Sequence, residues 1–586
     1  MPGARVALGS ATILYEGRDT VTKGIRTAVA ACVALVLPLV AASAMAAPGK
    51  KGPAPQAVAK AKTTSVQLLA INDFHGNLEP PSGSSGRIGT VDAGGVEFLA
   101  SHIDQLRATN PNTLVVSAGD LIGASPLLSG LFHDEPTIEA ANLFGLDFNA
   151  VGNHEFDEGA TALLRMQEGG CHPVDGCQDG TGFDGAEFDF LAANVEWEET
   201  GDTIFPPYKI VKFQGVKMAL IGMTLEGTPE IVTPSGIAGL EFHDEADTVN
   251  ALVPELLKQN VKTIVVLVHE GGFPTGAYNE CPGISGPIVD IVNRTSDEVD
   301  LFVTGHTHQA YNCVIDGRPV TSAASFGRIV TDIDMTISRA SKQPVEIRVN
   351  NNIVTRDVAR DPAQTELIER YRVVAAPIAN RVVGSITADI TRTNNTAGES
   401  SLGDHIADAQ LAATSDPALG GAVVALMNPG GIRTDLVFNQ ISGGELPGQV
   451  TYGEIFAVQP FGNNLVTMTL TGDQLERVLE QQWGPGTRQV ILQISDSLRY
   501  TWDASAPIGD RIATSSITIN GTPISPLATY RVTVNNFLAD GGDGFTVLRE
   551  GTNRLGGVVD TDAFADYLGD NSPLSPTPRN RITRLN

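Results

Sequence analysis

Short apolar runs rich in β-branched residues alternate with amphipathic stretches from Val66 onward. The runs occupy residues 65–71, 112–118, 148–152, 190–195, 216–223, 261–268 and 299–305, and each is bounded by glycine or polar residues. Continuous apolar runs of this length are typical of strands covered on both faces. The stretches between them, such as 95–109 and 245–259, have helical apolar spacing. The pattern predicts a layered α/β domain over residues 65–345.

A second α/β domain is predicted over residues 384–586. Its pattern contains a helix at 401–414, strands at 463–470 and 529–537, and many glycine turns. A helix at 361–383, which starts with polar residues, lies in a connector at 346–383. The chain shows no internal repeat, and we expect two domains.

The N-terminal pattern is that of a signal peptide over residues 1–46. Lys23 and Arg26 precede an apolar run that ends in small residues, with Ala44-Met45-Ala46 as the cleavage motif. The alternative is a single membrane anchor, but the short apolar core and the small residues favour cleavage. Residues 47–64 then form an aperiodic tether. We therefore expect a secreted or envelope-associated protein without stable membrane insertion.

Composition narrows the possible partners. The chain has 586 residues, is 42% apolar and 18% charged, and carries a net charge of −28. The electrostatic field of this negative net charge repels phosphate polymers, so we expect no binding of nucleic-acid polymers. If the substrate is a small anion, local cations must overcome the field, and metal ions are the obvious candidates. The composition leaves the oligomeric state open.

The cysteines indicate disulfides. Cys32 belongs to the signal segment, and four cysteines remain. An even number in an exported chain favours two disulfides. Of the three possible pairings we favour Cys171–Cys177, which closes a small loop, together with Cys281–Cys313.

Polar side chains follow five of the apolar runs at the point where each run ends. These side chains are Asp73, His75, Asp120, Asn153, His154, Asp157, His269, His306 and His308. The carboxyl ends of parallel strands meet at the ligand crevice of a sheet, so the five strand ends can deliver their side chains to one place. A single histidine of this kind is more often structural, but five of the ten histidines in the chain lie at these ends. As a set they indicate a metal site.

The ligand types select the metal chemistry. Nitrogen and oxygen donors without thiolate favour Zn²⁺, Mn²⁺, Fe²⁺ or Co²⁺ over Cu(I). Seven candidate ligands exceed the needs of one tetrahedral ion, but they match two ions that share a carboxylate. Two-metal sites stabilise the attacking and leaving oxygens of a displacement at phosphorus. The sequence therefore predicts a phosphoryl-transfer site.

In this order the motifs resemble the calcineurin-like metallophosphoesterases. The segments "NDFHGNLEP", "GNHEFDEG" and "TGHTHQ" resemble in particular the 5′-nucleotidase family, which includes bacterial UDP-sugar hydrolases. The segments "MNPGGIRTDL", "QPFGNNL" and "NNFLADGGDGF" are similar to the nucleotide-binding C-terminal domain of that family. The resemblance covers about residues 66–560. It implies an α/β fold in which a four-layer β-sandwich flanked by helices precedes a smaller α/β domain.

The resemblance also implies roles in the first domain. Two divalent metal ions (Zn, Mn, Co or Mg) would be bound, one by Asp73, His75 and His308 and the other by Asn153, His269 and His306, with Asp120 bridging them. His154 would stabilise the transferring phosphoryl group or protonate the leaving oxygen, and Asp157 would orient it. His308 stands where some relatives have Gln.

In the second domain the resemblance implies a nucleotide site. Phe461 and Phe537 would stack on the base, Arg433 would bind phosphate, Asn428 and Asn463 would contact phosphate or base, and Asp543 would bind the ribose hydroxyls. Core packing of the two phenylalanines and a surface ion pair for Arg433 are the alternatives. Well-studied relatives carry a substrate-binding arginine in the segment that here contains Gly398, Glu399, Ser400 and Asp404, and Arg392 is the nearest arginine.

These features predict a secreted enzyme that hydrolyses extracellular nucleotides, with nucleoside di- and triphosphates or UDP-sugars as further substrates. A phosphodiesterase acting on 2′,3′-cyclic nucleotides or dinucleotides is the first alternative, because it uses the same metals and the missing arginine is compatible with it. A non-catalytic nucleotide-binding protein is the second alternative, and the complete ligand set argues against it.

Overall fold

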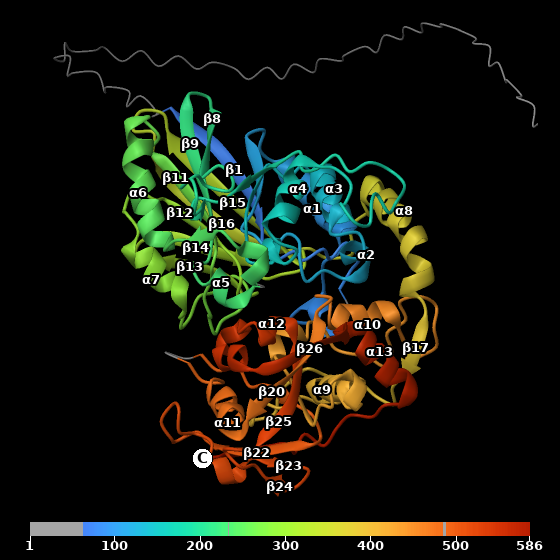
Figure 1. Cartoon of the computed structure of the whole chain (residues 1–586). Helices are drawn as coiled ribbons and strands as arrows, with labels where there is room; N and C mark the ends of the chain where they lie inside the picture. Colours follow the sequence, from blue (N-terminus) through green and yellow to red (C-terminus); the bar gives the residue numbers. More distant parts are fainter. Residues whose placement is uncertain (1–61, 82, 233, 485–487) are drawn as a thin grey trace, which may run out of the picture. The chain divides into compact units, whose positions relative to one another are not determined.

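The first part of the chain folds into two six-stranded sheets (Figure 1). The structure is a computed structural model that describes residues 62–81, 83–232, 234–484 and 488–586. The predicted signal peptide and all but the last residues of the predicted tether lie outside these ranges.

The first sheet has the order β16-β15-β1-β4-β5-β6. Its strands are β16 (Pro344–Ile353), β15 (Ile329–Ser338), β1 (Thr63–Ile71), β4 (Thr113–Ser117), β5 (Phe148–Ala150) and β6 (Asp189–Leu191). Strands β1, β4, β5 and β6 are parallel, whereas β15 and β16 are antiparallel additions at one edge. Strand β16 thus extends this sheet into the segment that the sequence pattern assigned to the connector.

The second sheet has the order β13-β14-β12-β11-β9-β8. Its strands are β13 (Ala310–Ile315), β14 (Arg318–Ala323), β12 (Leu301–Thr304), β11 (Thr263–His269), β9 (Val216–Thr224) and β8 (Tyr208–Phe213). Strands β9, β11, β12 and β14 are parallel. Two small pairs, β2 (Arg87–Ile88) with β3 (Val91–Asp92) and β7 (Val195–Trp197) with β10 (Leu240–Phe242), lie outside the two sheets.

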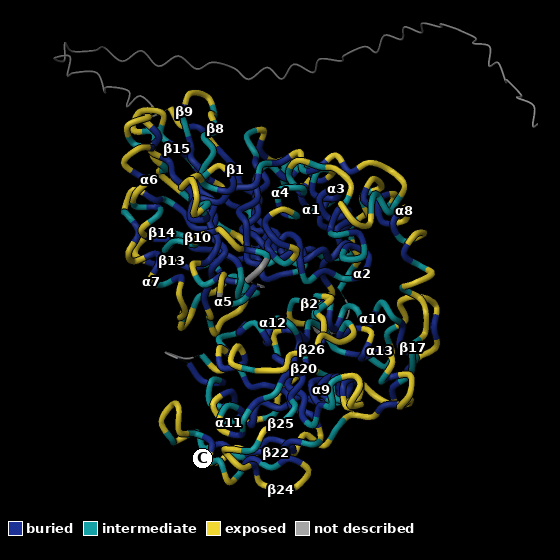
Figure 2. Tube along the Cα trace, in the orientation of Figure 1, coloured by how far each residue is buried: buried dark blue, intermediate teal, exposed yellow. Residues whose placement is uncertain are grey.

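The apolar runs are continuous because both faces of each sheet are covered. Leu68 of β1 and Val265 of β11 belong to one buried cluster between the sheets. Leu69 of β1, one residue further on, packs instead in the cluster that includes helices α1 (Val96–Arg107), α3 (Glu135–Phe144) and α4 (Ala160–Glu168). Val266 of β11 packs with helices α6 (Glu245–Lys258) and α7 (Pro287–Arg294). Figure 2 shows these strands as buried tubes. The predicted four-layer sandwich is confirmed.

The second part of the chain is built on a five-stranded sheet of order β21-β18-β25-β20-β26. Its strands are β21 (Gln493–Ile494), β18 (Val424–Met427), β25 (Thr529–Asn535), β20 (Asn464–Thr471) and β26 (Thr552–Val559). Helix α8 (Pro362–Ala379) precedes these strands in the chain. Five further helices lie before, between and after the strands: α9 (Ser401–Thr414), α10 (Tyr452–Val458), α11 (Gly472–Glu480), α12 (Asn536–Ala539) and α13 (Asp560–Asp570). Thr451 and Thr471 cap α10 and α11 with reciprocal side-chain hydrogen bonds to Glu454 and Gln474, which explains where these helices begin.

The remaining strands of this part form two smaller sheets. Strand β17 (Val382–Ser385) pairs with β19 (Gln449–Thr451), and β24 (Thr522–Pro523), β23 (Thr518–Ile519), β22 (Leu498–Asp503) and β27 (Ile582–Leu585) form a four-stranded sheet. Among the described residues, no helix combines the length and the hydropathy that a membrane span requires. The domain boundaries of the sequence analysis stay a prediction.

Candidate active site

The structure brings together the candidate metal ligands predicted from the strand ends. Asp73 and His75 follow β1, Asp120 follows β4, Asn153 follows β5, His269 ends β11, and His306 and His308 follow β12. The potential ligand atoms form three groups, and within each group they lie within 4.8 Å of one another. The groups are Asp73, His75 and His308; Asp120, His269 and His306; and His75, Asp120 and His154. Asp120 and His75 each belong to two of these groups, so the groups form one continuous cluster.

Sharp backbone turns aim these side chains. Asp73, His75, Asp120, His306 and His308 all have left-handed backbone conformations, with φ between 47° and 67°. Residues other than glycine rarely adopt this region, and such strain concentrates at functional sites. The turns are held by backbone hydrogen bonds across the sheet, from the Asp73 amide to Gly119 (2.9 Å) and from the His75 amide to Asp120 (3.0 Å). The strain indicates that the surrounding structure fixes the ligand geometry.

The donor atoms converge closely. The Asp120 Oδ2 lies 2.9 Å from His269 Nε2 and 3.6 Å from His75 Nε2. The Asp73 Oδ1 lies 3.2 Å from His308 Nε2, which is itself 3.1 Å from His75 Nε2. Three imidazole nitrogens and two carboxylates, nearly all buried, thus face the same small volume. Such a donor set fits divalent cations.

Hydrogen bonds on the outer side fix the tautomers of two histidines. His269 Nδ1 donates to the carbonyl oxygen of Ala118 (2.7 Å), and His75 Nδ1 donates to that of Gly123 (2.9 Å). Their Nε2 atoms therefore point inward, as in metal-binding histidines. The buried Nε2 of His269 faces the Asp120 carboxylate at 2.9 Å. The residues present therefore fit a metal ion.

The charges of the site support anionic carboxylates. Burial alone would raise the pKa of Asp120, but His269 and His154 hold it well below its usual range. Burial would likewise raise the pKa of Asp73, and His308 lowers it. Burial and the neighbouring His269 lower the pKa of His306 to about 4, so its ring is neutral and free to act as a ligand at neutral pH.

His154 and Asp157 form a pair from one turn. The Nδ1 of His154 lies 2.9 Å from Asp157 Oδ2, and the same carboxylate oxygen accepts from the amide of Ala124 (3.2 Å). The backbone amide of His154 donates to Asp120 Oδ1 (2.9 Å). Burial lowers the pKa of His154, but Asp157 and Asp120 outweigh it and raise the pKa. The pair is therefore arranged to hold a proton on the imidazole beside the metal ligands.

Glu155 has a structural function that the sequence analysis did not assign. Its buried carboxylate accepts hydrogen bonds from the amides of Asp120 (2.9 Å), Leu121 (2.8 Å) and Gly152 (2.6 Å). It thus ties the loop after β4 to the loop after β5. Its position in the polar segment after β5 is the only sequence signal for this function.

A cavity of about 290 Å³ adjoins the metal ligands. All six predicted substrate-binding residues line it, namely Asn428, Arg433, Phe461, Asn463, Phe537 and Asp543. Asn153, His154, Asp157 and His306 line it as well. Ile231, Val232 and Asn535 also line the cavity but were not predicted. Nothing in the sequence pattern distinguishes Ile231 and Val232 from core residues, whereas Asn535 opens the motif "NNFLADGGDGF".

The side chains in this cavity contact one another. The ring of Phe461 stacks on that of His154 with centroids 5.6 Å apart, and the Arg433 guanidinium lies 5.7 Å from the Phe461 ring centre. Asn428 Nδ2 donates to Asp543 Oδ2 (2.9 Å). Burial raises the pKa of Asp543, and this hydrogen bond opposes the effect. The cavity thus joins an aromatic and amide surface to the candidate metal centre.

The segment at residues 398–404 packs against the C-terminal segment of the chain. The buried Glu399 accepts from the Arg581 amide (2.8 Å), and Asp404 Oδ1 lies 3.7 Å from Arg581 Nε. These acids therefore hold the C-terminal segment against helix α9. Arg392, the nearest arginine, donates through Nη1 to the carbonyl oxygen of Ile432 (3.1 Å), directly before Arg433.

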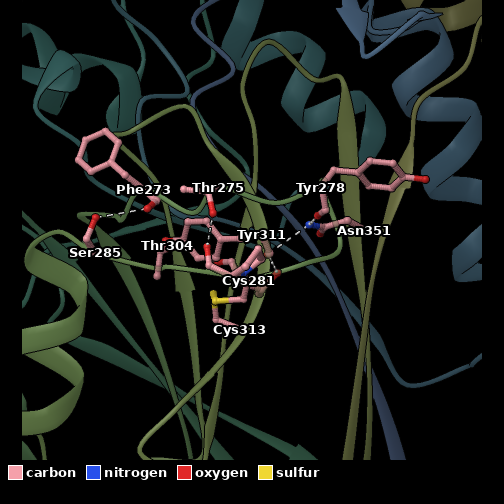
Figure 3. Close-up of a disulfide and its surroundings, with 11 residues drawn as sticks. Phe273, Thr275, Tyr278, Cys281, Ser285, Thr304, Tyr311, Cys313 and Asn351 are labelled. Carbon is pink, nitrogen blue, oxygen red and sulfur yellow. Dashed lines mark hydrogen bonds between the residues drawn. A yellow bond between two sulfur atoms is a disulfide. The ribbon is translucent and has the colours of Figure 1, made fainter.

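Both favoured disulfides are present, Cys171–Cys177 and Cys281–Cys313. Figure 3 shows the second, which joins the loop after His269 to strand β13. Within this loop, Ser285 Oγ donates to the Phe273 carbonyl oxygen (3.3 Å), and Asn351 Nδ2 donates to that of Tyr278 (2.7 Å). The disulfide thus fixes a segment that begins at a candidate metal ligand.

Two protein families match the chain. The calcineurin-like phosphoesterase family matches residues 66–310, and the 5′-nucleotidase C-terminal domain family matches residues 382–550. With the site described above, these matches define a metal-dependent phosphoric ester hydrolase.

Similar proteins cover most of the chain. It is 33% identical over 532 residues to Endonuclease YhcR of Bacillus subtilis, an alignment that covers 88% of this chain but only 41% of YhcR. It is 31% identical over 547 residues to Cell wall protein Lmo0130 of Listeria monocytogenes, covering 88% of this chain and 68% of that protein. The crystal structure of a 5′-nucleotidase precursor from Thermus thermophilus has a TM-score of 0.73 and 28% identity, and the match covers 89% of this chain and 99% of the other. The chain belongs to the 5′-nucleotidase family of calcineurin-like phosphoesterases, which confirms the resemblance seen in the motifs.

Proposed function

We propose that this protein is an exported, di-metal 5′-nucleotidase that releases phosphate from extracellular nucleotides and leaves a nucleoside. Nucleoside di- and triphosphates or UDP-sugars are further candidate substrates. The observation that carries the proposal is the cavity of about 290 Å³, since its lining combines candidate metal ligands with Phe461, Phe537 and Arg433. A nucleotide has the matching parts: a phosphate for the metal end and a flat base for the aromatic end.

The proposed metal ligands form two sets that share one carboxylate. Asp73, His75 and His308 would hold one divalent ion, Asn153, His269 and His306 would hold the other, and Asp120 would belong to both sets. When bound, two divalent ions supply activation of a water nucleophile and stabilisation of charge on phosphoryl oxygens. Asp120 Oδ2 lies 2.9 Å from His269 Nε2 and 3.6 Å from His75 Nε2, one histidine of each set, which supports this assignment.

His154 acts on the phosphoryl group or on the leaving oxygen. The carboxylate of Asp157 keeps the Nδ1–H of His154 directed at itself. The Nε2 of His154 therefore faces the cavity and can donate a proton there. Arg433 binds phosphate through its guanidinium group. The stack of Phe461 on His154 supports placing the base next to the proton donor.

The base is held by stacking on Phe461 and Phe537, the ribose by Asp543, and the phosphate or base by Asn428 and Asn463. Stacking of a base on an aromatic ring contributes about 1–3 kcal/mol. Because the residues come from both predicted domains, we expect a domain rotation during turnover. A crosslink between the domains that leaves turnover unchanged would contradict this expectation.

Export is supported by two observations. The disulfides are typical of oxidising compartments. A relative that is 31% identical carries the name of a cell wall protein. The N-terminal pattern of a cleaved signal peptide agrees with both.

The test is phosphate release by the mature chain, residues 47–586, from AMP, ATP, UDP-glucose and 2′,3′-cyclic AMP, each with Mn²⁺, Zn²⁺ or EDTA. Metal-dependent release from AMP or ATP supports the proposal and ranks the substrates. Asp120→Ala should abolish the release, and His154→Ala should slow it by about 10²–10⁴-fold. Absence of release with every metal would leave the non-catalytic nucleotide-binding alternative.

A phosphodiesterase is the second candidate function. The relative that is 33% identical carries the name of an endonuclease, and residues 398–404 contain no arginine, although the family resemblance leads us to expect a substrate-binding arginine there. Rates on bis(p-nitrophenyl) phosphate, on single-stranded DNA and on AMP separate the two functions. A preference for either diester would replace the nucleotidase proposal, and hydrolysis of DNA would also overturn the expectation that the chain binds no nucleic-acid polymer.

A further inference from the structure

A second cluster of metal-ligating side chains lies outside the candidate active site. His133, immediately before helix α3, and His172 and Asp175, in the loop closed by the Cys171–Cys177 disulfide, place potential ligand atoms within 4.8 Å of one another. The two imidazole rings are stacked, with centroids 3.6 Å apart and an angle of 14° between the planes, so one ring has to turn before both can direct a nitrogen at the same ion. From the closeness of the ligand atoms we propose that His133, His172 and Asp175 form a separate binding site for a divalent transition-metal ion such as Zn²⁺.

The position of Glu158 supports a ligand function for His133. Nδ1 of His133 contacts the Glu158 carboxylate at 2.9 and 3.0 Å. The opposite nitrogen, Nε2, faces Asp175 Oδ2 at 2.9 Å. In metal sites, a histidine commonly binds the ion through one ring nitrogen and donates the N–H of its other ring nitrogen to a carboxylate. The arrangement therefore presents His133 Nε2 to an ion beside Asp175.

The disulfide-closed loop holds the other two ligands in a fixed relation. The Gly176 amide donates to the His172 carbonyl oxygen (2.9 Å), which closes a tight turn between Cys171 and Cys177. In this turn His172 Nδ1 lies 3.4 Å from Asp175 Oδ2 and accepts from the Asp175 amide (3.1 Å). An ion bound at His172 Nδ1 replaces that hydrogen bond.

The charge and exposure of the cluster match an exchangeable ion. Glu158 and Asp175 balance the two positive charges of the ion, and Arg165 nearby is paired with Glu135. The histidine side chains are 18% and 17% exposed and Asp175 is 46% exposed, so a water molecule can complete a tetrahedral set.

The site is connected to the turn that carries the catalytic pair. Glu158 follows Asp157 directly in the chain. Asp134, next to His133, accepts from the Gly123 amide (2.9 Å), and the carbonyl oxygen of Gly123 accepts from His75. The cluster therefore lies against the outer side of the candidate active site without contributing to the substrate cavity.

The test counts bound zinc on the mature chain. Wild type, His172→Ala and Asp175→Asn are dialysed to equilibrium against buffered free Zn²⁺, and the zinc per chain is measured by mass spectrometry. His243→Ala is the matched control, because His243 is a partly exposed histidine that pairs with Glu196 (3.3 Å) away from the cluster.

Over part of the Zn²⁺ titration, we expect each of the two site variants to bind one zinc ion fewer than wild type and the His243→Ala control. Under saturating metal, all four proteins should release phosphate at equal rates. Equal zinc counts in wild type and both site variants at every free Zn²⁺ concentration would overturn the proposal. The outcome is a difference between variants, so it does not depend on how many ions the candidate active site holds.

Discussion

The pair of His154 and Asp157 allows a quantitative test of the proposed proton donor. The substitution is Asp157→Asn, which keeps the size of the side chain and removes its charge. The contact between His154 Nδ1 and Asp157 Oδ2 is 2.9 Å long, and the two side chains are 13% and 22% exposed. A hydrogen bond to a charged group in such a largely buried position contributes about 1.5–3 kcal/mol.

If the transition state requires a protonated and oriented His154, this loss lowers kcat by about 10- to 150-fold. His154→Ala removes the proton donor itself and should cost about 10²–10⁴-fold. The effects are not additive, because Asp157 acts only through His154, so the double variant should be no slower than His154→Ala.

The assay is steady-state phosphate release from the best nucleotide substrate under saturating metal. Glu168→Gln is the charge-matched control, since Glu168 is a carboxylate outside the cavity at the end of helix α4, shortly after this turn. It should behave as wild type. If Asp157→Asn keeps kcat within about twofold of wild type while His154→Ala is inactive, the carboxylate does not orient the imidazole and the reasoning is refuted.

Three further predictions concern the framework of the site. Gly152→Ala should abolish metal-dependent activity with retention of the fold, because the added Cβ would lie 2.2 Å from Asp120 Oδ1; metal content and circular dichroism check this. Replacement of Cys281 and Cys313 by serine should lower the free energy of unfolding by about 3–4 kcal/mol, as a loop of 32 residues is no longer closed, measured by denaturant titration. Burial raises the pKa of Asp404 to about 7, so this group destabilises the folded state as the pH rises from the ordinary carboxyl range through about 7; Asp404→Asn should reduce the fall in melting temperature between about pH 5 and pH 8.

Each of these predictions has a control or a contrary outcome. Gly556→Ala adds a Cβ with nothing within 4 Å and should keep full activity. Wild type treated with a reductant should be at least as destabilised as the double serine variant, because the reductant also opens Cys171–Cys177, and equal stability of oxidised and reduced protein would contradict the expected contribution of the disulfide. An Asp404→Asn variant with the same pH-dependent fall in melting temperature as wild type would show that another group is responsible.

The candidate metal ligands were predictable because each follows an apolar run. The run before His269 and the run before His306 became strands β11 and β12, and the polar residues after them emerge at one edge. The sequence could not show that β1 and β11 lie in different sheets, since their apolar runs have the same pattern. It could not show the left-handed turns either, because Asp and His are compatible with many backbone conformations.

Other parts of the site carried weaker signals. The six predicted substrate-binding residues were implied by the resemblance of their glycine-containing motifs to the 5′-nucleotidase family, and all of them line the cavity. Ile231 and Val232 line it too, but an apolar pair in a sequence looks the same whether it packs in a core or faces a ligand. From the sequence, Glu399 and Asp404 indicated only that no arginine stands in their segment. Their contacts with Arg581 could not be predicted, because Arg581 lies far away in the sequence.

The candidate ligands come from both sheets of the sandwich. Asp73, Asp120 and Asn153 follow strands of the first sheet, whereas His269 and His306 follow strands of the second. An ion held by both groups joins the two halves of the fold, so metal occupancy and folding are thermodynamically linked. Chelation should therefore loosen the whole sandwich, and the supply of metal in its surroundings would determine how long the protein survives there as well as how fast it works.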